Sequence, residues 1–231
     1  FRSIATITEP EDPYAPMAIT TGIESAVWAD QEFGEIELGD KRLSDRVVKI
    51  AYDKGNSPTC SYPKAVNGDR YAIKGYYGFL SNTNEEITFE QLLCKHRKST
   101  IQRIKGCNEV IAIQDTCDLS YPGLKKTKGL GVVAQQKKGG SGTPGLALHS
   151  TFAVNSEGIP LGIMNAQCDA NSFDGLTNKE RIRLPVEKKE SYKWIVHYRN
   201  TLEIADLCPE TQIISVMDRE ADYFELHEIV C

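Results

Sequence analysis

The sequence has no long hydrophobic run, no closely spaced pair of cysteines and no internal repeat. No apolar stretch reaches about 18 residues, so no transmembrane helix is predicted. The seven cysteines are odd in number and form no CxxC pair, which argues against a zinc ribbon and against a disulfide framework. We therefore expect a cytoplasmic protein with reduced thiols, including a small buried thiol at Cys117.

The start of the chain also lacks the basic and apolar regions of a secretory signal, and its first methionine is Met17. We expect residues 1–23 to be a leader outside the fold, either disordered or derived from upstream or added sequence. With 231 residues and an apolar content of 40%, the chain is long enough for one large domain or two modest ones with a real core.

Charge is distributed unevenly, although the net charge of −5 is modest. Residues 1–40 carry a net charge of −8, residues 41–105 carry +7 and residues 106–231 carry −4. A cationic middle segment beside an acidic one is typical of a phosphate-binding module next to a metal site. A solvated lysine-rich surface gives the same pattern, so the charge alone does not decide between the two.

Residues 24–105 have the pattern of a small all-helical domain. The expected elements are a helix over residues 28–33, a helix capped by Asp40, a loop over residues 55–68, a helix over residues 69–80 and a helix from Thr88 to about Lys105. In the helix after Asp40, Leu43, Val47 and Ile50 share one face. The basic side chains of that helix spread over the rest of its surface.

After residue 106 the pattern changes to strands. The expected elements are strands over residues 110–114, 146–154, 159–164 and 213–217, a long loop over residues 121–145, a hairpin turn over residues 155–158 and a helix over residues 186–207. A hairpin meander followed by a helical crossover predicts a mixed sheet, with the crossover strand parallel to the first strand and beside it. The fold class is therefore mixed α/β, after a helical N-terminal domain.

Two aspartates follow apolar, β-branched runs in this second region. Asp115 comes after the run at residues 110–113, and Asp218 comes after the run at residues 213–216. We expect both where a strand ends, at the edge of the sheet where open α/β folds bind ligands. Two neighbouring carboxylates suit a hard cation such as Mg²⁺. The alternative is that each aspartate merely caps a turn or a helix.

Residues 218–222 spell DREAD, a motif in one branch of the bacterial insertion-sequence transposases of the DDE type. Residues 113–116 (IQDT), with LSY at residues 119–121, resemble the strand that carries that family's first catalytic aspartate. Further resemblance lies at residues 28–29, 38–43, 128–131, 145–151 and 157–162. The resemblance runs from about residue 24 to the end, and the motifs follow one another in the family's order.

This resemblance implies a ribonuclease H-like catalytic core over residues 106–231, incomplete at its C-terminus, and a DNA-binding domain over residues 24–105. It implies a transposase that binds transposon-end DNA and catalyses metal-dependent strand cleavage and strand transfer. The implied cofactor is Mg²⁺, with Mn²⁺ as a substitute. The implied partners are double-stranded end and target DNA and, for the full-length protein, a second copy in a homodimer. The implied location is the bacterial nucleoid.

By the same resemblance, Asp115 and Asp218 are the first two catalytic and metal-binding carboxylates. Arg219 and Glu220 fall inside the motif, and Glu220 either supports the ligands or simply supplies negative charge in a first helical turn. The DNA-binding candidates are Lys41, Arg42, Arg46 and Lys49. For each of these basic residues, a solvated helix face is an equal alternative.

The aromatic and histidine side chains are open to two interpretations each. His149 lies among apolar neighbours in a predicted strand, which favours a hydrogen-bonded core histidine over a metal ligand. Tyr71, Tyr76 and Tyr77 are suited to stacking on DNA, but we expect at least one of them to pack in the core.

The family's third carboxylate, a glutamate in a Tyr-Arg-Glu-Lys signature, has no match in this sequence, and we expect the chain to be unable to complete cleavage alone. Three hypotheses follow: a DDE transposase fragment, a non-catalytic DNA-binding remnant or repressor of a transposable element, and a different ribonuclease H-like nuclease. The third would need another carboxylate, for which Asp222, Glu225 and Glu228 are poor candidates.

Overall fold

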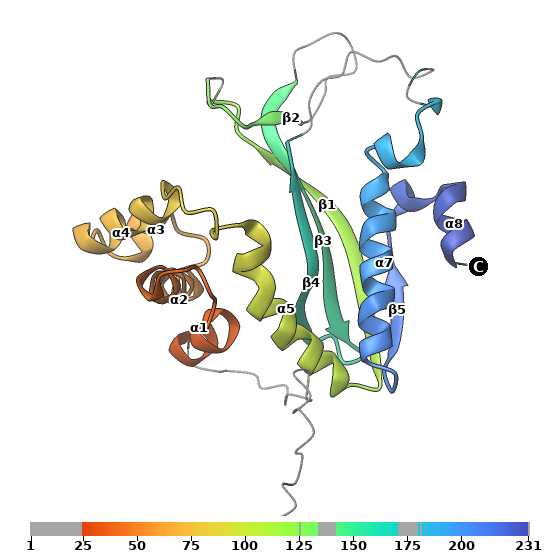
Figure 1. Cartoon of the computed structure of the whole chain (residues 1–231), viewed down its shortest axis with the longest axis horizontal. Coiled ribbons are helices and arrows are strands. Elements are labelled where there is room, and N and C mark those ends of the chain that lie inside the picture. The colour runs from red at the N-terminus through yellow and green to blue at the C-terminus, as the bar shows by residue number, and fades with distance from the viewer. Residues whose placement is uncertain (1–24, 125, 134–141, 171–179, 181, 231) are drawn as a thin grey trace, which may run out of the picture. The chain divides into compact units, whose positions relative to one another are not determined.

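The computed structural model describes residues 25–124, 126–133, 142–170, 180 and 182–230. The leader expected at residues 1–23 lies outside these residues. The chain separates into two compact units, one ending at Gly106 and the other beginning at Cys107 (Figure 1). None of the described helices is long and apolar enough to cross a lipid bilayer.

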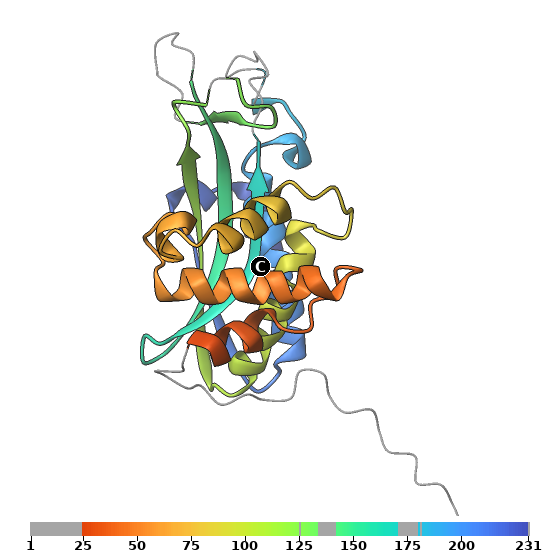
Figure 2. The same cartoon turned by 90° about the vertical axis from the view of Figure 1, so that its left-hand side faces the viewer.

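The described part of the first unit is helical. Its elements are α1 (Ser25–Phe33), α2 (Lys41–Asn56), α3 (Tyr62–Ala65), α4 (Arg70–Leu80) and α5 (Phe89–Lys105). The apolar side of α2 forms a core with residues from α4, α5 and the segment after α1, as the helical pattern predicts. Buried residues of this core are Ile36, Leu38, Val47 and Phe79. Figure 2 shows α2 lengthwise beside α3 and α4.

Each long helix of this unit begins at a side-chain cap. Asp40 accepts a hydrogen bond from the backbone N–H of Arg42, Asp69 from that of Tyr71 and Thr88 from that of Gln91. Caps of this kind satisfy backbone donors that have no partner within the helix. The starts predicted at Asp40 and Thr88 are confirmed. The loop predicted over residues 55–68 is wrong in part, because α3 forms within it and begins with Pro63 in its first turn.

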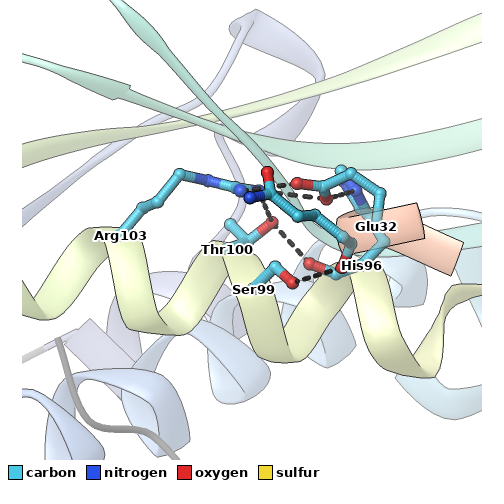
Figure 3. Close-up of polar contacts among 6 residues, drawn as sticks. Glu32, His96, Ser99, Thr100 and Arg103 are labelled. Carbon is cyan, nitrogen blue, oxygen red and sulfur yellow. Dashed lines mark hydrogen bonds and ion pairs between the residues drawn. The ribbon is translucent and has the colours of Figure 1, made fainter. Parts of the chain in front are cut away.

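A buried group of charged side chains holds α1 against α5 (Figure 3). Glu32 is 2% exposed, and its carboxylate accepts from Arg103 Nη1 at 2.6 Å and lies 2.5 Å from Nδ1 of His96. Burial alone would raise the pKa of Glu32, but the hydrogen bonds from His96 and Arg103 outweigh burial and lower it. The Arg103 guanidinium also donates to Thr100 Oγ1 at 3.4 Å. This group makes α5 an integral part of the first unit.

The second unit is a mixed sheet with helices. Its elements are β1 (Glu109–Ser120), β2 (Gly131–Val133), β3 (Thr143–Asn155), β4 (Pro160–Asp169), the 3-10 turn η1 (Val186–Lys188), α7 (Tyr192–Leu207), β5 (Gln212–Val216), the 3-10 turn η2 (Arg219–Ala221) and α8 (Phe224–Val230). The strand order is β2-β3-β1-β5, and β4 also pairs with β3. All pairs are antiparallel except β1–β5, which is parallel.

The connection between β1 and β5 therefore follows the sequence prediction. The crossover strand β5 lies beside β1 and runs parallel to it, and α7 packs against the sheet (Figure 1). Trp194 and Ile195 of α7 are 1% exposed and form a second core with Ala221 and Leu226. The mixed α/β class is confirmed.

Several predicted boundaries differ from the structure. β1 continues to Ser120 because β3 is long enough to pair with it as far as Gly145. The predicted loop over residues 121–145 contains β2, and α7 begins at Tyr192 rather than near residue 186. Cys117 is exposed, not buried, because the outward-facing positions of β1 are open from Ile113 onward.

Candidate nucleic-acid interface and metal site

The basic residues of α2 do not form one equivalent set. Lys41 and Arg42 are exposed in the first turn, next to the cap at Asp40. Both are free to approach a phosphate from solvent, and the guanidinium of Arg42 offers the planar donors that suit phosphate oxygens.

Lys49 has a partner within its own helix. Its ammonium group lies 2.5 Å from Asp53 Oδ1 and 5.4 Å from the centre of the Tyr52 ring. Asp53 is 7% exposed and also accepts from the Tyr62 hydroxyl at 2.7 Å. Burial and this hydrogen bond raise the pKa of Tyr62. Lys49 therefore neutralises a buried carboxylate, and its charge is less available for DNA than that of Arg42.

Arg46 extends from α2 to α4. It is half-buried, and a Cβ atom placed on Gly75 would collide with its guanidinium group. Gly75 thus provides the space in which this side chain lies. The contact brings a charge of α2 against α4, and the basic residues of these two helices are together called the basic surface of the first unit.

The exposed side of α4 adds two basic residues, Arg70 and Lys74, that sequence reasoning did not select, beside two of the tyrosines that it did. Arg70 and Lys74 are exposed, Tyr71 is 90% exposed and Tyr77 is 54% exposed. Tyr76 instead stacks on Tyr62, with ring centroids 4.2 Å apart. The signal in the sequence was the alternation of basic residues and tyrosines along this helix, since such a face can combine phosphate contacts with stacking.

In the second unit, Asp115 lies within β1 rather than at its end. The register pairs it with Ser150 of β3. Its expected position at a strand terminus is therefore wrong, because the β1–β3 ladder continues for five more pairs, to Ser120 and Gly145. Asp115 does lie beyond the last β1–β5 pair, Ile113–Val216. Asp218 lies at the same level, two residues after Val216.

Asp115 and Asp218 project from the same side of the sheet. Residues paired in neighbouring strands point to the same side, and successive residues alternate. Ile113 and Val216 are such a pair, so the residues two positions further along each strand, Asp115 and Asp218, share their side. Both aspartates are exposed, and Asp218 keeps an extended backbone with φ −81° and ψ −178°. Neighbouring strands are about 4.8 Å apart, so the register sets the backbones of the two aspartates at one level of the sheet.

Each aspartate also accepts one backbone hydrogen bond. The N–H of Thr116 donates to Asp115 Oδ1 at 2.8 Å, and the N–H of Glu220 donates to Asp218 Oδ1 at 2.7 Å. These bonds fix the carboxylate orientations. They also show that the capping alternative applies to Asp218, which caps η2. Among the described residues, the backbone bonds above go to Oδ1 of each aspartate, and two hard oxygen donors fit Mg²⁺ with water in its remaining positions.

Arg219 and Glu220 lie in η2, and both are exposed. The backbone N–H of Glu220 orients Asp218. Across the described ranges, no group of three or more His, Cys, Asp or Glu side chains is arranged to hold a metal.

The comparison with known families adds an independent finding. Residues 25–84 match the family model described as transposase DNA-binding. The matched range begins with α1 and extends past α4, and so includes the basic surface of α2 and α4. This match supports a transposase that binds DNA.

Proposed function

We propose that the chain belongs to a transposase of the DDE type, which binds transposon-end DNA through its first unit and cleaves and joins DNA strands through its second. The observation that supports the catalytic part most strongly is the parallel β1–β5 register, because it brings Asp115 and Asp218 to one level and one side of the sheet. The match of residues 25–84 supports the DNA-binding part.

DNA binding in this proposal depends on phosphate contacts. Lys41 and Arg42 at the start of α2, Arg46 beside Gly75, and Arg70 and Lys74 on α4 provide the positive charge. Such contacts neutralise phosphates and release counterions, so affinity falls as salt rises. They position the duplex without reading its sequence. The exposed rings of Tyr71 and Tyr77 suit stacking on bases at distorted or unpaired DNA ends.

In the second unit, Asp115 and Asp218 would hold Mg²⁺ or Mn²⁺. A bound divalent ion supplies activation of a water or 3′-hydroxyl and charge stabilisation at the leaving oxygen. The protein's own contribution is to hold both carboxylates by backbone N–H groups, in extended segments that are neighbours in the sheet. A ribonuclease H-like fold, an insertion-sequence and nucleoid origin, a homodimer and a target duplex belong to the same proposal.

A second candidate function is a non-catalytic DNA-binding remnant or repressor. It is favoured by one observation: in the part of the chain that the structure describes, no three His, Cys, Asp or Glu side chains gather in one group that could hold a metal. This candidate shares the DNA surface of the first but makes no use of Asp115 and Asp218.

One experiment on the full 231-residue chain separates the two. DNA duplexes are selected by binding from a random pool, and the selected duplexes are then incubated with the protein and Mg²⁺ or Mn²⁺. The transposase proposal predicts that the protein binds a defined DNA sequence and that salt weakens this binding. It also predicts that Mg²⁺ or Mn²⁺ changes the DNA complex, and that this metal dependence is lost in the Asp115→Asn variant. The non-catalytic remnant or repressor is supported if DNA binding is salt-sensitive but changes neither on addition of metal nor in the Asp115→Asn variant. Failure to bind any duplex contradicts both.

A further inference from the structure

A layer of polar side chains lies buried behind Asp115, on the opposite side of the sheet. The inward positions of β1 change at this level from apolar residues to Gln114 and Thr116, and the paired positions of β3 are Thr151 and His149. Gln114 is 2% exposed, Thr151 0% and His149 1%. Burying polar groups costs free energy unless hydrogen bonds compensate. The inward residues that precede this layer on β1, Val110 and Ala112, are apolar and fully buried, so the change to polar side chains occurs at the level of Asp115.

Thr116 joins this layer to the candidate metal ligand. Its backbone N–H lies beyond the end of the β1–β5 ladder and donates to Asp115 Oδ1 at 2.8 Å. Its hydroxyl lies 2.8 Å from Nδ1 of His149, its partner on β3. One residue thus holds the carboxylate with its main chain and a buried histidine with its side chain.

His149 is itself held firmly. Its ring meets the rings of Trp194 and His197 edge to face, with centroids 4.5 and 4.3 Å away. Burial, together with the nearby charge of Lys193, lowers the pKa of His149 to about 4. The ring is therefore neutral near pH 7, and in the tautomer that carries its proton on Nε2, Nδ1 accepts a hydrogen bond from the Thr116 hydroxyl.

We propose that Thr116 and His149 are positioning residues for Asp115. His149 fixes the Thr116 side chain, and the Thr116 amide in turn fixes the Asp115 carboxylate in the orientation that binds a divalent cation. This inference rests on the proposed function, because it requires Asp115 to be a metal ligand. Groups that orient metal ligands in this way commonly change metal affinity when they are replaced.

The test measures Mn²⁺ binding to the full chain by electron paramagnetic resonance of free Mn²⁺, alongside thermal unfolding. Thr116→Val removes the hydroxyl but keeps the shape and the backbone N–H. It is expected to weaken Mn²⁺ binding roughly tenfold while the unfolding temperature stays near that of the wild type. Thr116→Ser, which keeps a hydroxyl, is expected to retain wild-type affinity.

Thr151→Val is the matched control. Its hydroxyl lies in the same layer, 2.9 Å from His197 Nδ1, and does not contact Asp115. It is expected to leave Mn²⁺ affinity unchanged. His149→Asn provides a second route, and its effect on affinity should not add to that of Thr116→Val, because both changes break one contact.

Two results overturn the inference. One is wild-type Mn²⁺ affinity in both Thr116→Val and His149→Asn, and the other is an equal loss in Thr151→Val. If Thr116→Val fails to fold, the Mn²⁺ affinity of His149→Asn alone tests the inference. A wild-type chain without Mn²⁺ binding, or binding that Asp115→Asn leaves intact, contradicts the proposed metal site itself. Binding that depends on Asp115 but not on Thr116 contradicts only the positioning role.

Discussion

Ile113 of β1 and Val216 of β5 form the last pair of a parallel ladder, and each is followed two residues later by an exposed aspartate. The antiparallel partner of β1 on its other side, β3, continues well past this level. At Asp115, the edge of β1 that faces β5 is therefore past the last pair of the described β1–β5 ladder. In the proposed function, a divalent cation would bind both carboxylates at this level of the sheet.

The basic surface of the first unit leads to a prediction about individual residues. Arg42→Gln is expected to weaken binding to a random-sequence duplex and to reduce the slope of log affinity against log salt by about 1. Lys126→Gln serves as the control, because it removes one positive charge from an exposed position in the second unit. It should leave the DNA affinity and its salt slope nearly unchanged. Equal losses in the two variants would indicate a general charge effect and would contradict the α2 surface.

Lys49→Gln should behave differently from Arg42→Gln. Because Lys49 neutralises the buried carboxylate of Asp53 at 2.5 Å, the change removes a stabilising partner rather than a free positive charge. We expect a lower unfolding temperature and a smaller loss of DNA affinity than in Arg42→Gln. Calorimetry and fluorescence anisotropy on the same samples check this, and a loss of affinity larger than that of Arg42→Gln would show that Lys49 contacts DNA directly.

Glu32 should carry much of the acid sensitivity of the first unit. Its pKa is lowered in the folded state, so its contribution to stability is complete above its unfolded value of 4.5 and is lost as the pH falls through the lower folded value. Glu32→Gln removes the buried carboxylate that pairs with Arg103 and His96, which is expected to cost about 3 kcal/mol or more at neutral pH. It should also remove part of the stability loss below pH 4.5. Denaturant unfolding at several pH values measures both, and an unchanged pH profile would argue against the role of Glu32.

His149 predicts a pH dependence in the second unit. An unfolded histidine gains a proton as the pH falls below 6.5, whereas folded His149 stays neutral until about pH 4. The unfolded state then binds more protons, so stability falls as the pH decreases from 6.5 toward 4. His149→Gln should flatten this part of the profile. The same slope in wild type and variant would assign the dependence to other groups.

Local chemistry explains which features the sequence could predict. Asp40 and Thr88 are caps whose effect is limited to one helical turn, so they marked the starts of α2 and α5 correctly. The β-β-β-α-β order implied the parallel β1–β5 pair, because a helical crossover returns a strand in parallel. The caps depend on residues close in sequence, and the parallel pairing depends on the order of the strands and helices.

Features that depend on distant partners were missed. The length of β1 is set by β3, which is why Asp115 was expected at a strand end. Cys117 was expected to be buried because free cysteines usually are, and its position on the open side of β1 overrides that tendency. The pairing of Lys49 with a buried Asp53 depends on the packing of Tyr62 from α3, a helix that the sequence pattern did not show. The place of Arg46 beside Gly75 depends on how α2 packs on α4.

The most direct test of the metal site is Mn²⁺ binding to the full chain in three variants, Asp115→Asn, Asp218→Asn and Asp118→Asn. Asp118 is an exposed aspartate on the same strand, three positions from Asp115, and its side chain alternates to the opposite side of the sheet. The shared site predicts a loss of roughly tenfold or more in each of the first two variants and none in the third. Binding that survives in Asp115→Asn and Asp218→Asn, or that falls equally in Asp118→Asn, would contradict it.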